Sequence, residues 1–257
     1  GALGNSEIAT PNLDALVARG TAFTNAYIMG GSCGAVCMPS RAMLMTGRSL
    51  YRIQEQGQSI PDDHVLLGEA LQQGGYDTFG TGKWHNGTRA FARSFSAGGE
   101  IFFGGMGDHW NVPACDFDPS GEYASRIDQT VDFRTQDVRQ WTSDHIRAGV
   151  HSSELFCDAA IDFLRARPAG GNPFFAYISF MAPHDPRTMP RQYLEMYDPA
   201  RIELPASFMA EHPFDNGELK IRDEMLAPFP RTPDEVRQHI AAYYAMITHL
   251  DDHIGRV

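Results

Sequence analysis

The sequence has few cysteines, an excess of acidic over basic residues, and no long apolar run. Its four cysteines in 257 residues are too few for a disulfide scaffold, and their spacing matches no zinc motif. Lysine and arginine number 21 against 32 aspartates and glutamates, a formal net charge of -11. That balance argues against a nucleic-acid partner, although a small anionic substrate could still enter a locally basic pocket. No apolar run reaches the about 18 residues of a membrane span.

The overall amino-acid composition is typical of a globular protein, with 42% hydrophobic and 21% charged residues. The length suits one large α/β domain or two small ones. The chain begins at Gly1 without an initiator methionine or a leader, and it stops at Val257 just after a helical pattern. We therefore expect an internal piece of a longer protein.

Apolar periodicity and turn residues indicate alternating strands and helices. Helices are predicted at 10–20, 39–46, 64–73, 152–167 and 232–255. Strands are predicted at 21–28, 76–81 and 173–180, and the last is a continuous apolar run typical of a strand buried on both faces of a parallel sheet. The proline-rich stretch 186–231 is expected to be mostly loop with short helices. This alternation predicts a layered α/β fold.

Residues 86–150 show little periodicity and are predicted to be an insertion that shapes a site. Within it, Asp108–Asn111 and Cys115–Asp118 combine aromatic and carboxylate groups. Such groups suit the face and hydroxyls of a sugar ring, and ordinary packing explains the aromatic residues equally well.

The chemistry of the first candidate site lies in Cys37-Met38-Pro39-Ser40-Arg41. Cys37 precedes a predicted helix, whose unpaired N–H groups and dipole favour an anion. Arg41 lies four residues on and can offer a forked cation to the same anion. The alternative is that Cys37 is a small buried hydrophobic residue before a proline-initiated helix.

Two further motifs follow predicted strands, where open α/β sheets place ligand groups. Lys83 and His85 are two residues apart and should face one side of an extended segment, where they suit an oxyanion and a proton transfer. His184 and Asp185 follow the apolar strand at 173–180. The alternatives are a surface lysine with a core histidine, and a proline-framed turn.

These motifs together resemble the type I sulfatases of the alkaline phosphatase superfamily. The resemblance is carried in chain order by TPNLDALVARG at 10–20, C-x-P-S-R with the later T-G-R at 37–48, GKWH at 82–85 and APHD at 182–185. Met38 departs from the small residue that the family usually has. The resemblance implies a mixed, largely parallel sheet sandwiched by helices, with 1–257 a single but partial catalytic domain and 86–150 an insertion that lines the substrate pocket.

The resemblance also implies a role for five residues. Cys37, oxidised to formylglycine and hydrated, would be the nucleophile and a metal ligand, and Arg41 would stabilise it. Lys83 would bind the sulfate. His85 would hydrogen-bond the formylglycine and accept a proton when sulfate is expelled, and His184 would contact the sulfate ester near the leaving oxygen.

The family uses a divalent cation, usually calcium, and hard oxygen ligands suit that ion. Its acidic ligand pair precedes the first helix, but Glu7 is the only acid before Thr10 here. The remaining ligands, a D-H or D-N dipeptide, follow the final helix. With Cys37 as the single ligand present, we expect this chain alone to be inactive and the full-length protein to be a sulfatase.

A histidine and aspartate cluster near the end of the last predicted helix offers a competing metal site. His249 and His253 have the i, i+4 spacing that can hold zinc, and Asp251 and Asp252 lie between them. A solvated or capped helix end is the favoured interpretation.

The sequence therefore predicts hydrolysis of sulfate esters, with carbohydrate sulfates preferred and simple aryl or choline sulfates left open. The expected partners are a sulfated small molecule or carbohydrate and a formylglycine-generating maturation enzyme, and export to the periplasm or beyond is implied by the resemblance. One alternative is a phosphonate or phosphate monoester hydrolase of the same superfamily. The other is a non-catalytic carbohydrate-binding descendant.

Overall fold

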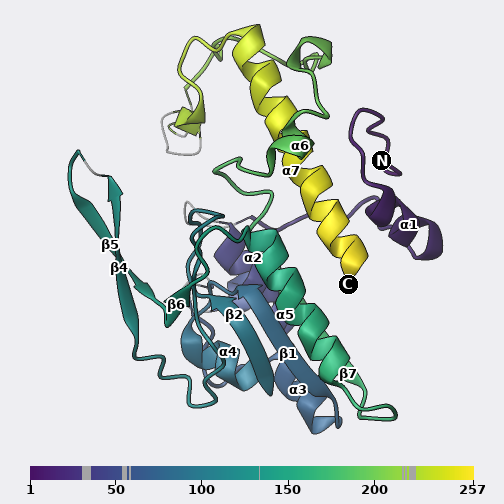
Figure 1. Cartoon of the computed structure of the whole chain (residues 1–257), viewed down its shortest axis with the longest axis vertical. Helices are drawn as coiled ribbons and strands as arrows, with labels where there is room; N and C mark the ends of the chain where they lie inside the picture. Colours follow the sequence, from purple (N-terminus) through teal and green to yellow (C-terminus); the bar gives the residue numbers. More distant parts are fainter. Residues whose placement is uncertain are drawn as a thin grey trace. The chain divides into compact units, whose positions relative to one another are not determined.

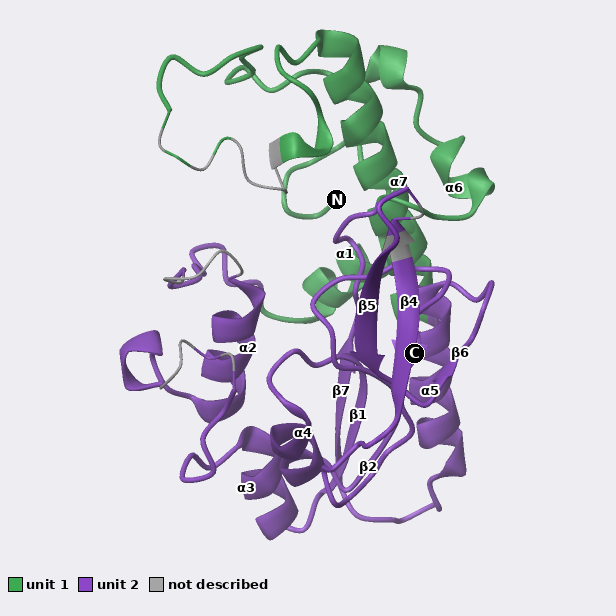
Figure 2. Ribbon diagram, turned by 90° about the vertical axis from the view of Figure 1, so that its left-hand side faces the viewer, with its two compact units in different colours: residues 1–21, 187–255 green, residues 22–186, 256–257 purple. Residues whose placement is uncertain are grey.

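The structure is a computed structural model, and it describes the chain apart from residues 31–35, 54–56, 58, 133, 216, 218 and 220–223. Cys33 lies outside the described residues. The chain forms two compact units, one of residues 1–21 with 187–255 and one of residues 22–186 with 256–257 (Figure 2). That both units act as one catalytic domain remains a prediction.

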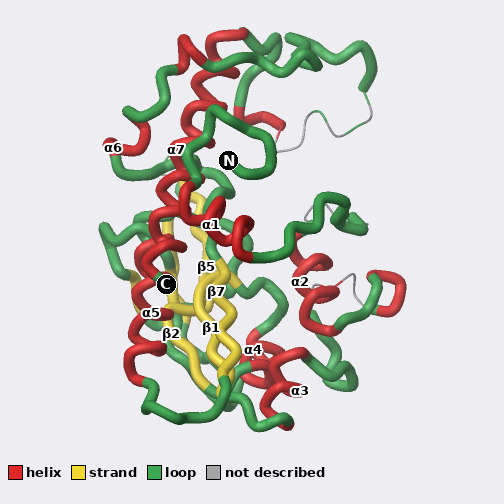
Figure 3. Tube along the Cα trace, turned by 90° about the vertical axis from the view of Figure 1, so that its right-hand side faces the viewer, coloured by secondary structure: helices red, strands yellow, loops and turns green. Residues whose placement is uncertain are grey.

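The larger unit is built on a three-stranded sheet in the order β2-β1-β7. The central strand β1 (Asp77–Lys83) pairs in parallel with β2 (Ala97–Phe102) and with β7 (Phe174–Ser179). Helix α5 (Ser152–Ala166) covers one face of this sheet, whereas α3 (Leu67–Gln73) and α4 (Thr88–Ser94) lie on the other side (Figure 3). The predicted α/β architecture is confirmed.

Close packing on both faces of β1 follows from two adjacent residues. Phe79 stacks on Phe163 of α5, with ring centroids 4.4 Å apart. Gly80 faces the other way, and a Cβ atom there would lie 2.7 Å from the rings of Phe91 and Phe95. Because successive strand residues point to opposite faces, an apolar ring on one side and a missing side chain on the other let helices approach both faces.

Most predicted helices are confirmed with small changes at their ends. The helices expected at 10–20, 152–167 and 232–255 correspond to α1 (Pro11–Arg19), α5 and α7 (Pro233–Arg256). The helix expected at 64–73 begins later, at Leu67. Its first turn is capped by the Glu69 carboxylate, which accepts the Leu66 N–H at 2.8 Å.

The strand predicted at 21–28 is wrong, because this segment has no regular secondary structure. Phe23 is 82% exposed and Tyr27 is 87% exposed. Alternating residues make a strand only where a neighbouring strand supplies hydrogen bonds, and none of the described strands pairs with it.

The strand predicted at 173–180 is present as β7, but it is not buried on both faces. It is an edge of the described sheet, and most of its residues are half-buried, with Phe174 46% exposed. The apolar run correctly indicated a parallel strand, whereas its burial depends on neighbours that a single segment cannot specify.

The stretch 86–150 is not an insertion throughout. It begins with α4 and with β2, which belongs to the central sheet. The glycine-rich sequence of β2, AGGEIF, lacks the alternation that marks a strand. After β2 come two small antiparallel pairs (Figure 1): β3 (Pro113–Ala114) with β6 (His145–Ile146), and β4 (Arg126–Asp132) with β5 (Asp137–Thr142).

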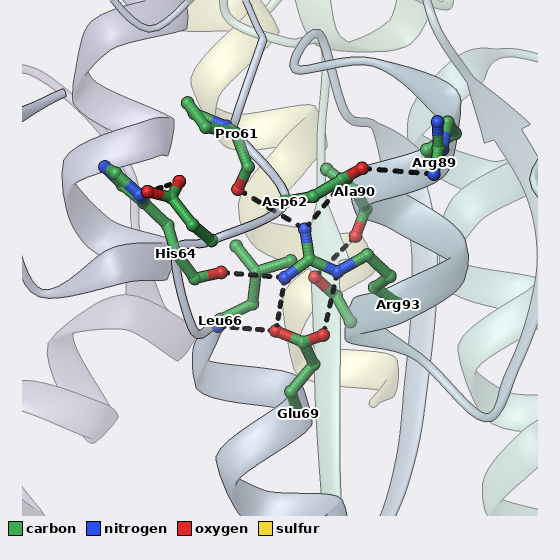
Figure 4. Close-up of polar contacts among 10 residues, drawn as sticks. Pro61, Asp62, His64, Leu66, Glu69, Arg89, Ala90 and Arg93 are labelled. Atoms are coloured by element: carbon green, nitrogen blue, oxygen red, sulfur yellow. Dashed lines mark hydrogen bonds and ion pairs between the residues drawn. The ribbon is translucent and has the colours of Figure 1, made fainter. Parts of the chain in front are cut away.

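A polar network joins α3, α4 and the preceding loop (Figure 4). Arg93 of α4 donates to both carboxylate oxygens of Glu69, at 2.8 and 2.9 Å, and to the carbonyl of His64 at 2.7 Å. It also pairs with Asp62 at 3.3 Å. A two-pronged ion pair of this kind is geometrically specific, so it sets the position of α3 relative to α4 on their side of the sheet.

The smaller unit contains α1, α7 and short helices. Short helical segments α6 (Arg191–Leu194), η3 (Pro199–Arg201) and η4 (Glu224–Leu226) interrupt the proline-rich stretch, as the sequence predicted. Thr232 caps α7 by accepting the N–H of Glu235 at 3.3 Å. No helix among the described residues is long and apolar enough to cross a membrane.

Asp251 is fully buried and caps a different helix from its own. Its carboxylate accepts the N–H groups of Asn12 at 3.0 Å and Leu13 at 2.8 Å, at the start of α1. Asp252 accepts a hydrogen bond from the Tyr193 hydroxyl at 2.7 Å. The aspartate pair is therefore occupied in joining helices within the smaller unit.

The two histidines beside that pair are buried and touch each other. The Nε2 atoms of His249 and His253 lie 3.0 Å apart. Among the described residues, no third metal-ligating side chain completes a group with them. The solvated helix end that the sequence favoured is therefore wrong for these residues, because His249, Asp251 and His253 are buried and Asp251 caps α1 rather than its own helix.

Candidate active site

Cys37 is the first residue of α2 (Cys37–Thr46), which begins two residues before the predicted start at 39. The first N–H groups of a helix lack partners within it, and they carry a partial positive charge. The Cys37 side chain is half-buried, and its Sγ lies 3.3 Å from Nδ1 of His85. The sulfur is therefore held at the helix N-terminus against an imidazole from another element.

The carboxyl end of β1 is shaped by Gly82. Its φ is 84°, and a Cβ atom there would lie 2.1 Å from the Ser179 carbonyl oxygen of β7. Only glycine combines this backbone angle with so close an approach. The pairing of β1 with β2 shifts register at the same place, between Thr81 and Gly82. Such a bulge turns the following side chains, and Lys83 is the next residue.

Trp84 anchors the motif that contains Lys83 and His85. It is 1% exposed, its N–H donates to the Phe102 carbonyl at 2.9 Å, and its indole N–H donates to Gly87 at 2.7 Å. With this large ring in the core, its two neighbours along the chain are directed away from it. Both reach Cys37, as the spacing predicted.

Arg41 ties α2 to the ends of two strands. Its Nη1 donates to the Lys83 carbonyl at 2.7 Å, the Tyr177 hydroxyl at 3.0 Å and the Ser179 hydroxyl at 2.5 Å. The guanidinium thus fixes the N-terminal turn of α2 beside β1 and β7. Tyr177 and Ser179 were not singled out in the sequence, although two hydroxyl residues spaced by two within an apolar strand are a recognisable signal.

The cluster is electropositive and largely shielded from water. Lys83 is only 3% exposed. Burial lowers its pKa, as does the charge of Arg41, and a Cys37 thiolate opposes them. The pKa of His85 falls to about 4, because of burial first and then the charges of Lys83, Arg41 and His184. His85 is therefore a neutral imidazole at pH 7.

His184 lies in the turn that follows β7. Its N–H donates to the Met181 carbonyl at 3.0 Å, and its Nδ1 is 3.0 Å from a carboxylate oxygen of Asp185. Its charge is one of those that lower the pKa of His85, so the two imidazoles share one electrostatic environment. The structure thus brings together all five predicted site residues: Cys37, Arg41, Lys83, His85 and His184.

Comparison with known protein families identifies the family of the chain. The family model described as Sulfatase matches residues 1–257. The chain belongs to the sulfatase family. An arylsulfatase of Clostridium perfringens is 29% identical over an alignment 274 residues long, gaps included. The alignment covers 100% of this chain and 55% of that protein. This sulfatase-family chain spans about a third to a half of the length of the curated relatives it matches.

Solved structures support the same fold. One neighbour, solved with its substrate D-glucosamine-2-N,6-O-disulfate, has a TM-score of 0.65 at 20% identity and covers 98% of this chain and 57% of its own. The phosphonate monoester hydrolase of Agrobacterium radiobacter has a TM-score of 0.61 at 19% identity. The match covers 99% of this chain and 55% of that protein's chain. The fold is therefore that of the sulfatases and their alkaline phosphatase-like relatives.

The sulfatase family uses a divalent metal, but the described residues near Cys37 do not form a site for one. The largest electrostatic influences on Lys83 and His85 come from cysteine, arginine, lysine and histidine side chains. Calcium takes six to eight oxygen ligands. One group with metal-ligand spacing occurs among the described residues, Asp116 with Asp144 and His145, and it does not include Cys37.

Two residues that the sequence did not single out hold the site in shape. A Cβ atom on Gly105 would lie 2.5 Å from Cε1 of His85, so the bare backbone of Gly105 packs against that imidazole. Asn86 is fully buried, and its amide donates to the carbonyls of Met38 at 3.0 Å and Gly57 at 2.5 Å. A glycine next to another glycine and an asparagine after GKWH carry no obvious sequence signal for these roles.

The segments expected to line a substrate pocket are partly used for packing. The Asp108 carboxylate accepts the Trp110 N–H at 2.9 Å, and Phe117 packs against the core. Cys115 is fully buried, and burial raises its pKa to about 12. Cys157 is also fully buried, and burial raises its pKa. A pocket-lining role for this stretch remains a prediction.

Proposed function

We propose that this chain carries the sulfate-binding part of a formylglycine-dependent sulfatase that hydrolyses sulfate esters. One observation supports the proposal most strongly: the Lys83 side chain is only 3% exposed and lies against Cys37 at the N-terminus of α2. A buried cation is costly unless an anion accompanies it. A sulfate ester would provide that anion in a protein whose net charge is otherwise -11.

Cys37 suits conversion to formylglycine, because its half-buried side chain lies beside His85 and Lys83. Hydrated formylglycine would supply the hydroxyl that attacks the sulfur of the ester. Arg41 would stabilise that residue from the same helix and hold the backbone of Lys83, to which it donates at 2.7 Å. Lys83 would bind a sulfate oxygen with its ammonium group, in a site where low exposure strengthens the attraction.

The two histidines would divide the proton transfers. His85 is neutral at pH 7, because its pKa is about 4, so its Nδ1 can accept a proton or a hydrogen bond from the residue at position 37. His184, beside the Asp185 carboxylate, would lie near the leaving oxygen and give it a proton as the ester bond breaks. His85 therefore has the charge state that a proton acceptor needs.

We propose calcium as the metal, in keeping with the resemblance of the motifs to type I sulfatases. Cys37 is the single ligand that the described residues supply, so no step above depends on the metal. For the substrate we propose a carbohydrate sulfate, supported by the sugar disulfate in one structural neighbour and by relatives named N-acetylgalactosamine-6-sulfatase. A formylglycine-generating enzyme would be the maturation partner, and export would follow as in the family.

The first experiment tests the nucleophile. The full-length protein is expressed with a formylglycine-generating enzyme, and the peptide that spans Cys37 is analysed by mass spectrometry. We expect the mass of an aldehyde residue in place of a thiol, and loss of that signal in Cys37→Ala. An unmodified cysteine under these conditions would count against the proposed mechanism.

The second experiment distinguishes sulfate from phosphorus esters. Phenyl sulfate, phenyl phosphate and a phenyl phosphonate monoester share one leaving group and differ in the transferred group. We expect the sulfate to be cleaved with the highest kcat/KM. Faster cleavage of the phosphonate would favour the alternative, which the structural similarity to a phosphonate monoester hydrolase keeps open. Binding of sulfated sugars without cleavage would favour the non-catalytic alternative.

A further inference from the structure

The turn that carries His184 is held by a buried histidine outside the predicted site. His109 is fully buried, and its Nε2 lies 3.0 Å from the carbonyl oxygen of His184. A carbonyl oxygen can only accept, so this nitrogen must carry the hydrogen. The His184 N–H is bonded as well, to the Met181 carbonyl. With both of its backbone groups bonded, His184 has little freedom to change the direction of its side chain.

His109 is itself fixed by the first residues of α5. Its Nδ1 lies 2.7 Å from the Ser152 hydroxyl, and its carbonyl accepts the Ser152 N–H at 2.7 Å. Burial lowers the pKa of His109, so its ring is neutral at pH 7. Since Nε2 carries the hydrogen, Nδ1 accepts from the Ser152 hydroxyl, and the tautomer is determined.

A second buried imidazole restrains the ring plane of His109. The rings of His109 and His151 are nearly parallel, 3° apart in orientation, with centroids separated by 5.0 Å. His151 caps α5, since its Nδ1 accepts the Ser153 N–H at 3.2 Å. The ring of His109 is therefore held in position and orientation by a helix that packs along the central sheet.

We infer that His109 is a positioning residue that fixes the backbone of His184, and with it the imidazole that faces the leaving group. The inference rests on the proposed function, which places His184 near the leaving oxygen. Proton donation matters most when the leaving alcohol is a weak acid. Loss of the His109 hydrogen bond should therefore slow poor leaving groups far more than good ones.

The test uses the full-length, formylglycine-containing enzyme and a series of sulfate esters from 4-nitrophenyl sulfate to a simple alkyl sulfate. In His109→Phe, which keeps a flat ring without a donor, kcat for the alkyl sulfate should fall about 10- to 100-fold, because small misplacements of a reacting group cost this much. For 4-nitrophenyl sulfate it should change less than about threefold. His184→Ala should show the same dependence on the leaving group.

Two further variants separate positioning from folding. His109→Gln places an amide nitrogen close to the Nε2 position and should restore alkyl sulfate turnover to within about threefold of wild type. His109→Asn is similar in polarity, but its amide stops one bond short of the Nε2 position. This variant should not restore alkyl sulfate turnover. If His109→Phe does not fold, this pair still tests the inference.

The matched control is His64→Phe, which alters another buried imidazole, one that lies 3.1 Å from the Arg52 carbonyl oxygen and is not bonded to the His184 turn. It should lower stability and leave the dependence on the leaving group unchanged. In the His184→Ala background, His109→Phe should cause no further loss. An equal fall for all esters, or independent effects of the two substitutions, would overturn the inference. A wild-type enzyme that cleaves no sulfate ester would instead refute the proposed function.

Discussion

The sulfur of Cys37 lies 3.3 Å from Nδ1 of His85, although 48 positions separate the two residues in the chain. This contact joins the N-terminus of α2 to the carboxyl end of β1. Arg41 reinforces it from the helix side by donating to the Lys83 carbonyl at 2.7 Å. The proposed nucleophile and its proposed proton acceptor are therefore held by regular elements on both sides.

Removal of the buried ammonium should abolish most of the sulfatase activity. In Lys83→Met, kcat/KM for a sulfate ester should fall about 10²- to 10³-fold, the usual cost of losing one group that stabilises developing negative charge. Steady-state kinetics on purified protein checks this. Arg89→Met is the matched control, because it removes a cation that is 73% exposed and paired with Asp62. Equal kinetics in both variants would show that Lys83 does not bind the ester.

The depressed pKa of His85 should make the protein less stable in acid. The pKa is about 4 in the folded state against 6.5 for an ordinary histidine. Between these values the unfolded state binds the proton more readily, so the free energy of unfolding should decrease as pH falls from 6.5 towards 4. Urea unfolding at pH 7 and pH 4.5 measures the loss. His85→Phe should lose less stability over that interval, and parallel losses in both proteins would contradict the assignment.

Gly105→Ala should impair catalysis by displacing the His85 ring. The added Cβ would lie 2.5 Å from Cε1 of His85, so the ring or the backbone must move. A displacement of this size at a reacting group can reduce kcat about 10²-fold. Gly107→Ala is the control, because its Cβ would make ordinary contact at 3.6 Å with Phe102, and its kcat should stay within about twofold of wild type. Similar kcat values for the two variants would mean that Gly105 does not constrain His85.

Asn86→Ala should destabilise the larger unit. The variant removes the donors to the buried carbonyls of Met38 and Gly57, which should lower the free energy of unfolding by about 2 kcal/mol. Urea unfolding followed by circular dichroism provides the measurement. Asn172→Ala, which removes an exposed bond to Asp77, should cost less than about 0.5 kcal/mol. A comparable cost in both variants would argue against a special role for Asn86.

The five candidate site residues could be named from the sequence because the motifs that contain them resemble, together and in chain order, those of the type I sulfatases. C-x-P-S-R, GKWH and APHD each place a reactive side chain at the end of a predicted element, and parallel strands bring such ends to one edge of a sheet. The residues that support them could not be predicted in this way. Gly105, Asn86 and His109 act through contacts with distant segments, and no local periodicity reports such contacts.

The failures of prediction have the same cause. Residues 21–28 alternate like a strand, yet no described strand pairs with them. Strand β2 lacks alternation and nevertheless lies in the central sheet, because residues 79–83 of β1 pair with it in parallel. Strand formation depends on hydrogen bonds to another segment, and the local sequence records this only indirectly.

The amino-acid sequence by itself determined most of the helices, two of the three strands of the central sheet, and which side chains carry reactive groups, since these follow from short-range periodicity and residue chemistry. The tertiary structure alone decided the charge state of His85 and the contacts that hold the site residues in place. The pKa of His85 falls because of burial and the nearby Lys83 and Arg41 charges, and the His184 turn is held by His109 from 75 residues away. Burial and long-range hydrogen bonds exist only after distant segments have packed together.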